Sequence, residues 1–260
     1  AKHGHELFRL AEKNGVDLYY EASVAGSIPI IRTLKMGYAA DHISEISGII
    51  NGTTNYILSE MDQKGRAYAA VLKEAQAAGY AEANPDADVS GLDAAYKLAI
   101  LASVGFHTRV SVKDVYCEGI ERLDPVDLAL ARRMGYVIKL LARASQTPEG
   151  LALSVSPAFI DRSHPLANVS GVYNAIFLKG DFVGEAMLYG RGAGSEPTGS
   201  AVVSDILDVV YSFGQHVSRR NLVTEYRRLP LRPCALAERQ FYLRFELKDQ
   251  PGVLAKITAV

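Results

Sequence analysis

The order of the hydrophobic patterns along the chain is the feature that most constrains its fold. Helix-like and strand-like stretches alternate over the first half, whereas residues 136–188 hold four strand-like stretches in succession. A final helical pattern follows at residues 199–213. Alternation that gives way to a cluster of strands is typical of an α+β domain. The sequence therefore predicts one mixed β-sheet with helices packed on one of its faces.

Turn residues and apolar spacing predict the bounds of the individual elements. Residues 81–90 contain Asn-Pro-Asp and several acids and are predicted to form a loop, in which Asp86 and Asp88 cap turns. Residues 225–239 are irregular and are predicted to be a linker. The predicted helices span residues 6–13, 29–36, 55–63, 68–78, 92–104, 125–134 and 199–213, with another beginning near 252. The predicted strands span residues 16–24, 43–50, 136–144, 151–159, 172–179, 185–188 and 241–247.

Composition and charge argue against several classes of protein. The 260 residues carry a formal net charge of −1, which gives no electrostatic basis for binding nucleic acid or an anionic membrane. No apolar run reaches the roughly 18 residues of a membrane span, and the polar first residues are unlike a secretory signal. Cys117 and Cys234 lie far apart without a partner motif, so a reducing cytoplasm is the expected location. Both ends fall inside helical patterns, which predicts a longer parent protein.

A charged pair lies on the most apolar of the predicted helices. Asp93 and Lys97 are four residues apart and therefore share one side of that helix. They form either an ordinary ion pair on the solvent side or a proton-exchanging lysine with a carboxylate that orients it or the substrate. Glu82 adds a second carboxylate three residues after Gly79, where a ligand can approach the backbone closely. The residues alone leave both interpretations open.

Two further segments have the residues to hold a ligand. Glu21 precedes a tight turn, where its carboxylate either joins backbone carbonyls around a hard cation or accepts hydrogen bonds from the next helix N-terminus. The residues favour the second interpretation. Residues 190–197, Gly-Arg-Gly-Ala-Gly-Ser-Glu-Pro, suit a phosphate or ribose contact and equally a tight structural turn. The chain contains no dinucleotide-binding glycine fingerprint.

Four blocks of the sequence resemble the homoserine dehydrogenase family. The third block, Gly-Tyr-Ala-Glu-Ala-Asn-Pro with Asp88 and then Gly-Leu-Asp-Ala-Ala-Tyr-Lys-Leu, is similar to the family signature. Together the blocks cover about residues 16–215 in the expected order, which is far more specific than a single motif. The four blocks occupy residues 20–30, 48–58, 79–98 and 189–198.

The resemblance implies an NAD- or NADP-dependent oxidoreductase that interconverts L-homoserine and L-aspartate 4-semialdehyde in threonine, methionine and isoleucine biosynthesis. Lys97 would donate the proton to the aldehyde oxygen in the reductive direction. Gly192 and Gly194 would contact the cofactor. The residues that would bind homoserine are Gly79, Glu82 and Asp93. A monovalent cation, Na⁺, would be held by Glu21 and the carbonyls of Val24, Gly26 and Ile28.

The same resemblance divides the chain into four parts. Residues 1–20 would end a Rossmann nucleotide-binding domain, and residues 21–220 would form the catalytic, substrate-binding and dimerisation domain. Residues 221–240 would be a linker, and residues 241–260 would begin an ACT-like regulatory domain with a ferredoxin fold. The implied partners are a second copy of the chain, giving a homodimer, and threonine as an effector at the ACT domain.

The chain departs from the family pattern in places that matter for function. The nucleotide-binding domain is not within these residues, so the choice between NAD and NADP is undetermined and the chain alone is expected to bind cofactor poorly. Ser27 stands where a glycine is expected after Gly26, and Asn84 stands where aspartate is commoner.

Two other interpretations compete with this enzyme. One is a non-catalytic regulatory or dimerisation module of a larger protein, and the other is a dehydrogenase for another semialdehyde or a sugar acid. A lysine and two acids around an apolar helix argue against the first, because a scaffold has no use for them. The block at residues 79–97 argues against the second.

Overall fold

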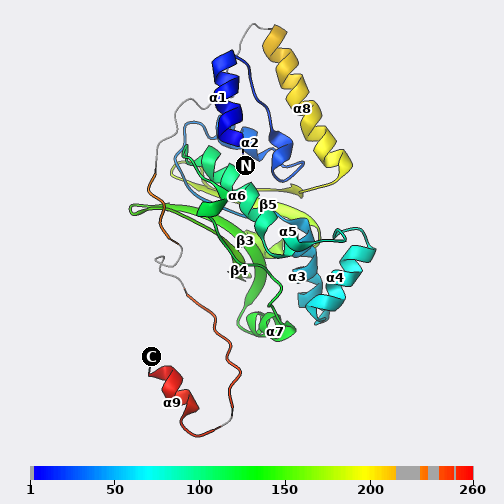
Figure 1. The fold of residues 1–260 in the computed structure, drawn as a ribbon, viewed down its shortest axis with the longest axis vertical. Coiled ribbons are helices and arrows are strands. Elements are labelled where there is room, and N and C mark those ends of the chain that lie inside the picture. Colours follow the sequence, from blue (N-terminus) through cyan, green and yellow to red (C-terminus); the bar gives the residue numbers. More distant parts are fainter. Residues whose placement is uncertain (1–2, 215–228, 234–239, 249, 260) are drawn as a thin grey trace.

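The computed structural model describes residues 3–214, 229–233, 240–248 and 250–259, whose arrangement is shown in Figure 1. At its centre is a six-stranded sheet in the order β2-β4-β3-β1-β5-β6. The β2–β4 pair is parallel and the other pairs are antiparallel, so the sheet is mixed, as predicted. The strands are β1 (Ile43–Ile49), β2 (Tyr116–Cys117), β3 (Tyr136–Thr147), β4 (Gly150–Asp161), β5 (Tyr173–Gly180) and β6 (Gly184–Arg191).

The helices largely follow the predicted pattern. Helix α2 continues directly into a π-helical turn, Thr33–Gly37, and short 3₁₀ turns occur at Glu21–Ser23, Val112–Asp114 and Pro165–Asn168. No helix in the described part of the chain is long and apolar enough to cross a membrane. The helices are α1 (Gly4–Asn14), α2 (Ile30–Arg32), α3 (Gly52–Lys64), α4 (Tyr68–Ala77), α5 (Asp86–Val89), α6 (Leu92–Gly105), α7 (Pro125–Arg133), α8 (Ser195–Gly214) and α9 (Val253–Thr258).

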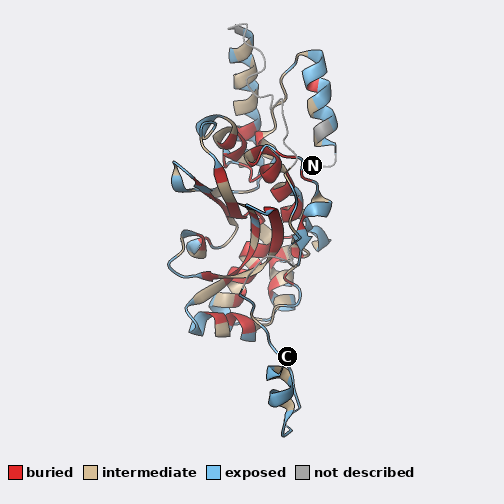
Figure 2. Ribbon diagram, turned by 90° about the vertical axis from the view of Figure 1, so that its left-hand side faces the viewer, coloured by how far each residue is buried: buried red, intermediate tan, exposed pale blue. Residues whose placement is uncertain are grey.

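The main core lies between one face of the sheet and the helices. Helix α6 packs against β1, β3 and β4, and α3 packs against β3 and β5. Leu98 and Leu101 of α6 are each 1% exposed, and burying such a side chain contributes roughly 1.5–3 kcal/mol. Figure 2 shows buried residues concentrated in the sheet and its adjoining helices. A smaller cluster around Ile49 and Phe177 packs separately from this core.

Two of the predicted strands are wrong. Residues 16–20 have no regular structure and residues 21–23 form a 3₁₀ turn, where residues 16–24 were expected to be extended. Residues 241–247 also form no strand. In both cases the β-prone composition is present, but no described strand lies alongside to share backbone hydrogen bonds. A strand is defined by that pairing, so propensity alone does not produce one.

Two boundaries near the predicted loop also differ. Residues 86–89 of the expected loop form the short helix α5: Asn84 accepts a hydrogen bond from the Asp86 N–H, and Pro85 stands directly before the helix, where its missing N–H costs nothing. Helix α3 begins at Gly52 and not at residue 55, because Asn51 caps it. The two boundaries meet in the structure, where Asn51 donates a hydrogen bond to Asp88 of α5.

Much of the predicted linker at residues 221–240, together with Cys234, lies outside the described residues. The part that is described, residues 229–233, runs beside β4. The Leu151 N–H donates to the Pro230 carbonyl and the Arg232 N–H donates to the Leu151 carbonyl, each at 2.9 Å. Further on, the Tyr242 hydroxyl donates to Asp127 of α7 at 2.8 Å.

Candidate active site

The four sequence blocks meet at one end of the sheet. Ile49 of β1 pairs with Ala175 of β5, which in turn pairs with Tyr189 of β6. Because these neighbours are antiparallel, the end of β1, the start of β5 and the end of β6 lie at the same edge. The chain leaves β1 into Asn51 and leaves β6 into the glycine-rich segment. The topology therefore brings together segments that are more than 100 residues apart.

Lys97 is tied to this edge by contacts outside its own helix. Its Nζ donates to Asp93 Oδ2 at 2.6 Å and to the carbonyl of Ile50, the residue after β1, at 3.2 Å. The side chains of Lys97 and Asp93 are 21% and 31% exposed, so a small ligand can still reach both. A simple solvent-side ion pair needs no strand carbonyl. The geometry favours the interpretation in which the lysine is positioned for use.

Asn51 connects two acids to the same cluster. Its Nδ2 donates to Asp88 Oδ1 at 2.7 Å and to Asp93 Oδ2 at 2.9 Å. The sequence interpretation missed both Asn51 and Asp88, since it treated Asp88 as a turn former. The available signal was Asn-Gly-Thr-Thr directly after a strand, which is typical of a helix N-cap at a strand end. With two carboxylates and one ammonium group, this cluster suits a ligand that brings a positive charge.

Gly79 and Glu82 lie at the rim of this cluster. Gly79 has a positive φ of 75°, and a Cβ there would meet no atom of the described chain within 4 Å, so its backbone is open to a ligand. The Thr53 hydroxyl donates to the Tyr80 carbonyl at 2.8 Å and fixes this loop to α3. The Glu82 side chain is exposed and makes no hydrogen bond or ion pair within the described residues. The structure thus joins Asp93 and Lys97 directly, but not Glu82.

Helix α3, which begins just after the end of β1, is held to the sheet by a buried lysine. Lys139 of β3 is 5% exposed and donates to Asn55 Oδ1 at 3.0 Å and to the Val169 carbonyl at 2.6 Å. Asn55 in turn donates to the Tyr173 carbonyl at 3.0 Å. Burial lowers the pKa of Lys139 to about 8. The first turn of α3 is therefore fixed against both β3 and β5.

The glycine-rich segment packs on the loop that follows Glu21. A Cβ on Gly26 would lie 2.7 Å from the Gly192 carbonyl oxygen, so the two backbones touch. Ser27 donates to the Arg191 carbonyl from its N–H at 3.2 Å and from its hydroxyl at 2.9 Å. Gly194 has a φ of 123°, which only glycine adopts without strain. The predicted cofactor block and the predicted cation loop are thus direct neighbours.

A buried amide beneath Gly192 fits a ligand at this segment. Asn174 is 1% exposed, and among the described residues its Oδ1 has no hydrogen-bond partner. A Cβ on Gly192 would lie 1.8 Å from the Asn174 Nδ2, so glycine is the residue that leaves room for the amide. A buried polar atom without a partner costs roughly 1–3 kcal/mol. A ligand that donates a hydrogen bond to Asn174 Oδ1 would remove that cost.

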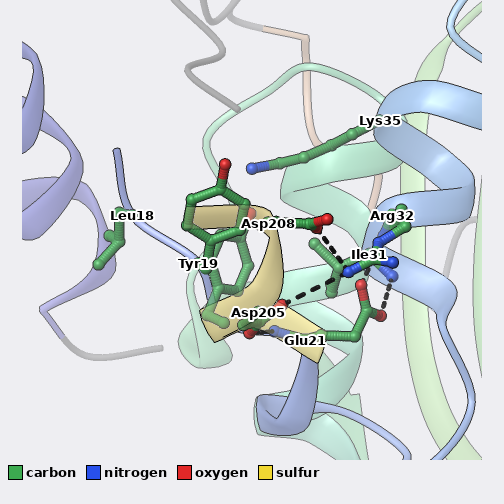
Figure 3. A pocket seen from close by; sticks show the side chains of 9 residues that line it. Leu18, Tyr19, Glu21, Ile31, Arg32, Lys35, Asp205 and Asp208 are labelled. Carbon is green, nitrogen blue, oxygen red and sulfur yellow. Dashed lines mark hydrogen bonds and ion pairs between the residues drawn. The ribbon is translucent and has the colours of Figure 1, made fainter. Parts of the chain in front are cut away.

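Glu21 performs the helix-capping role that its residue context favours. Its Oε1 and Oε2 accept hydrogen bonds from the backbone N–H groups of Ile31 and Arg32, each at 2.8 Å. Figure 3 shows the carboxylate pointing at these two groups. Burial raises the pKa of the Glu21 carboxyl, while the two backbone N–H groups act to lower it. Both oxygens are therefore occupied in fixing the start of α2.

A small charged pocket lies beside Glu21 and away from Lys97. Arg32 donates to Asp208 at 2.6 Å, and Asp205 accepts from the Glu21 N–H at 3.0 Å (Figure 3). Burial lowers the pKa of Lys35, also in the pocket, to about 8. The lining residues are Leu18, Tyr19, Tyr20, Glu21, Ile31, Arg32, Lys35, Asp205 and Asp208.

The loop after Glu21 fits part of the cation site that the resemblance implies. Ala25 and Gly26 both have positive φ, 55° and 46°, and turn the chain sharply. Backbone carbonyls around such a turn are the ligands that a hard cation takes. Each oxygen of the Glu21 carboxylate accepts one backbone N–H and keeps a second lone pair. The shape of the turn therefore fits the backbone share of the implied site.

Comparisons with known proteins identify the family of the chain. Residues 29–207 match the family model described as homoserine dehydrogenase. A relative named homoserine dehydrogenase from Neisseria gonorrhoeae is 46% identical over 265 residues, covering 100% of this chain and 61% of that protein. The crystal structure of a homoserine dehydrogenase from Thiobacillus denitrificans is 42% identical, with a TM-score of 0.88 over 99% of this chain and 61% of that one.

A third similar protein was solved as a complex with a cofactor. It is a hyperthermophilic archaeal homoserine dehydrogenase mutant in complex with NADPH, 28% identical with a TM-score of 0.70, covering 81% of this chain and 61% of that one. This chain spans about three fifths of the length of these relatives. The family model covers more than half of the chain, and the fold agrees with that of the solved family member. The chain therefore belongs to the homoserine dehydrogenase family.

Proposed function

We propose that this chain is the catalytic part of an enzyme that interconverts L-homoserine and L-aspartate 4-semialdehyde with NAD or NADP. The observation that carries the proposal is the position of Lys97, held between Asp93 and the Ile50 carbonyl and still partly exposed. A lysine fixed by two acceptors at the edge of a sheet is suited to deliver a proton to one point. Family membership supplies the substrate and the cofactor class.

In this mechanism the nicotinamide, when bound, supplies or accepts the hydride. Lys97 donates a proton from Nζ to the aldehyde oxygen in the reductive direction and takes it back in the oxidative direction. Asp93 orients the lysine and, with Glu82 and the Gly79 backbone, binds the polar groups of homoserine. The net negative charge of the cluster favours the substrate ammonium group.

Gly192 and Gly194 are proposed to contact the cofactor. The absence of side chains lets a ligand approach the backbone there, and the Asn174 amide lies directly beneath Gly192. The NADPH complex of the archaeal relative supports a nicotinamide cofactor without deciding between NAD and NADP. A monovalent cation, Na⁺, is proposed at the carbonyls of Val24, Gly26 and Ile28, next to Glu21.

The remaining family features are also part of the proposal. A homodimer through the sheet face opposite the helices is supported by Met187 and Tyr189 of β6, which are 40% and 54% exposed. An ACT-like regulatory domain that binds threonine is also proposed; a helix begins after Gly252 as expected, whereas the strand expected at residues 241–247 does not form. Threonine, methionine and isoleucine biosynthesis would be the pathways served, and the cytoplasm would be the location.

The deciding experiment measures homoserine oxidation at the nicotinamide absorbance. It uses this chain, a version extended N-terminally through a nucleotide-binding domain, and the extended version with Lys97→Ala. Activity in the extended version alone, abolished by Lys97→Ala, is expected. No activity in either folded version would contradict the proposal and favour a regulatory or dimerisation module.

A further inference from the structure

Asn51 has a side chain whose two ends bind different partners. Its Oδ1 accepts hydrogen bonds from the Thr54 N–H and the Thr54 hydroxyl, both at 2.9 Å, and so caps α3. The Thr54 N–H can only donate, which fixes the carbonyl end of the amide toward the helix. The NH₂ end must then point away from α3. Asn51 is 5% exposed, so the orientation is held by its surroundings.

The NH₂ group joins acids that come from two different helices. Asp88 lies in α5 and Asp93 in the first turn of α6, and each accepts one hydrogen bond from Asn51 Nδ2. Two acceptors of one NH₂ group lie roughly 5 Å apart. Carboxylates so close repel each other, and shared donors offset that repulsion. Asn51 is therefore a neutral bridge that allows both acids to face the same space.

The bridge reaches the lysine through one shared atom. Asp93 Oδ2 accepts from Asn51 and also from Lys97 Nζ. Lys97 is held from its other side by the carbonyl of Ile50, the residue directly before Asn51. Two consecutive residues at the end of β1 thus fix the acid and the lysine at once. Neither contact depends on the i,i+4 spacing within α6.

We infer that Asn51 is a positioning residue for the proton-transfer group: it holds Asp88 and Asp93 as a pair and, through Asp93, fixes Lys97. The inference rests on the proposed function and adds to it a residue outside the implied site. Asn51 acts through Asp93 and does not itself need to touch the substrate. Its helix-capping role is separate, because that role uses only Oδ1.

The test exploits the near-equality of asparagine, serine and aspartate as N-caps. Asn51→Ser keeps a cap but lacks the NH₂ bridge, and Asn51→Asp keeps a cap but places a third carboxylate beside the other two. In the extended enzyme, kcat is expected to fall about 10-fold in Asn51→Ser and about 100-fold in Asn51→Asp, the range for residues that orient a reacting group. The unfolding midpoint of Asn51→Ser should stay close to that of the unaltered protein, whereas Asn51→Asp should lower it, because its new carboxylate is buried beside two others.

Asp124→Ser is the matched control, because Asp124 caps α7 by the same type of bond to the Val126 N–H. That exchange should leave kcat and KM unchanged. Equal kcat in the unaltered and Asn51→Ser enzymes would overturn the inference, and so would a loss in Asn51→Ser that follows its unfolding midpoint.

A crystal structure of Asn51→Ser provides a readout that does not depend on activity. The Asp88 carboxylate is expected to turn away from Asp93, and the contact between Asp93 and Lys97 is expected to lengthen. If both acids and the lysine keep their positions, Asn51 is only a cap. This outcome can be read even if the unaltered enzyme does not oxidise homoserine, so failure of the inference and failure of the proposed function remain distinguishable.

Discussion

The Lys97 cluster and the Glu21 pocket contain the same kinds of side chain and use them in opposite ways. Both combine acids with a lysine. Glu21 is buried, and each of its carboxylate oxygens accepts one backbone N–H, so the side chain is fixed at the start of α2. Asp93 and Lys97 bind each other and the end of β1 but remain partly exposed. We therefore expect that burial, and not residue type, separates a structural cluster from a reactive one.

The largest expected effect comes from Lys97→Ala in the extended enzyme. We expect kcat to fall by roughly 10²–10⁴-fold, because a positioned proton donor contributes that much. The unfolding free energy should change by less than about 1 kcal/mol, since the pair is partly exposed. Lys64→Ala is the control, because Lys64 forms an i,i+4 pair with Glu60 on an exposed surface. If kcat of Lys97→Ala stays within a few-fold of that of the unaltered enzyme, the Lys97–Asp93 pair is an ordinary ion pair like Lys64–Glu60.

Glu21→Ala tests the other side of the comparison. The change leaves two backbone N–H groups of α2 without an acceptor, so the unfolding free energy should fall by about 3 kcal/mol in urea titrations. The kcat per folded molecule should stay within a few-fold at both low and high sodium concentration. Lost activity that high sodium restores, with unchanged stability, would instead show that the carboxylate binds the cation.

Lys35 gives the pocket a pH dependence. Its pKa is about 8 in the folded protein and ordinarily 10.5, so between these values the unfolded chain binds more protons and folding stability rises with pH. From pH 8 to pH 10, the unfolding free energy should rise by about 1 kcal/mol more in the unaltered protein than in Lys35→Met, after allowance for solvent screening. Lys179→Met, at an exposed lysine of β5, is the control. If the unfolding free energy depends on pH equally in the unaltered protein and in Lys35→Met, the pocket does not lower the pKa of this lysine.

Ser27→Gly should have the smallest effect. It removes one exposed hydrogen bond between the Ser27 hydroxyl and the Arg191 carbonyl, while the Ser27 N–H bond to the same oxygen remains. The unfolding free energy should fall by less than about 1 kcal/mol. A larger loss, or a changed kcat, would mean that the loop couples the Glu21 pocket to the glycine-rich segment more tightly than these two bonds indicate.

The sequence predicted the α+β class and most elements because apolar spacing and turn residues are local signals. It failed at residues 16–24 and 241–247, where strand propensity was present without a neighbouring strand. It missed β2, whose two residues are too short to show a pattern. Local signals do not report which segments lie side by side, and strands depend on that.

The site was predicted in part for the same reason. Asp93 and Lys97 share a helix, so their spacing was informative, and Glu21 was correctly placed at a helix N-terminus. Asn51 and Asp88 are 37 residues apart, and their contact exists only because β1 ends beside α5. Glu82 was expected to join the cluster, but its side chain is exposed. Its proposed role depends on a substrate that brings the groups together.

Four side chains around the site donate hydrogen bonds to main-chain oxygens, which makes the acceptor positions tolerant of substitution. Ile50, Tyr80, Tyr173 and Arg191 each offer a carbonyl, to Lys97, Thr53, Asn55 and Ser27 respectively. Every amino acid carries that oxygen. Replacements at the four acceptor positions can therefore accumulate without erasing the contacts, provided that the strands keep their path. The four donor positions lack this tolerance, because each contact there requires the side chain of the residue itself.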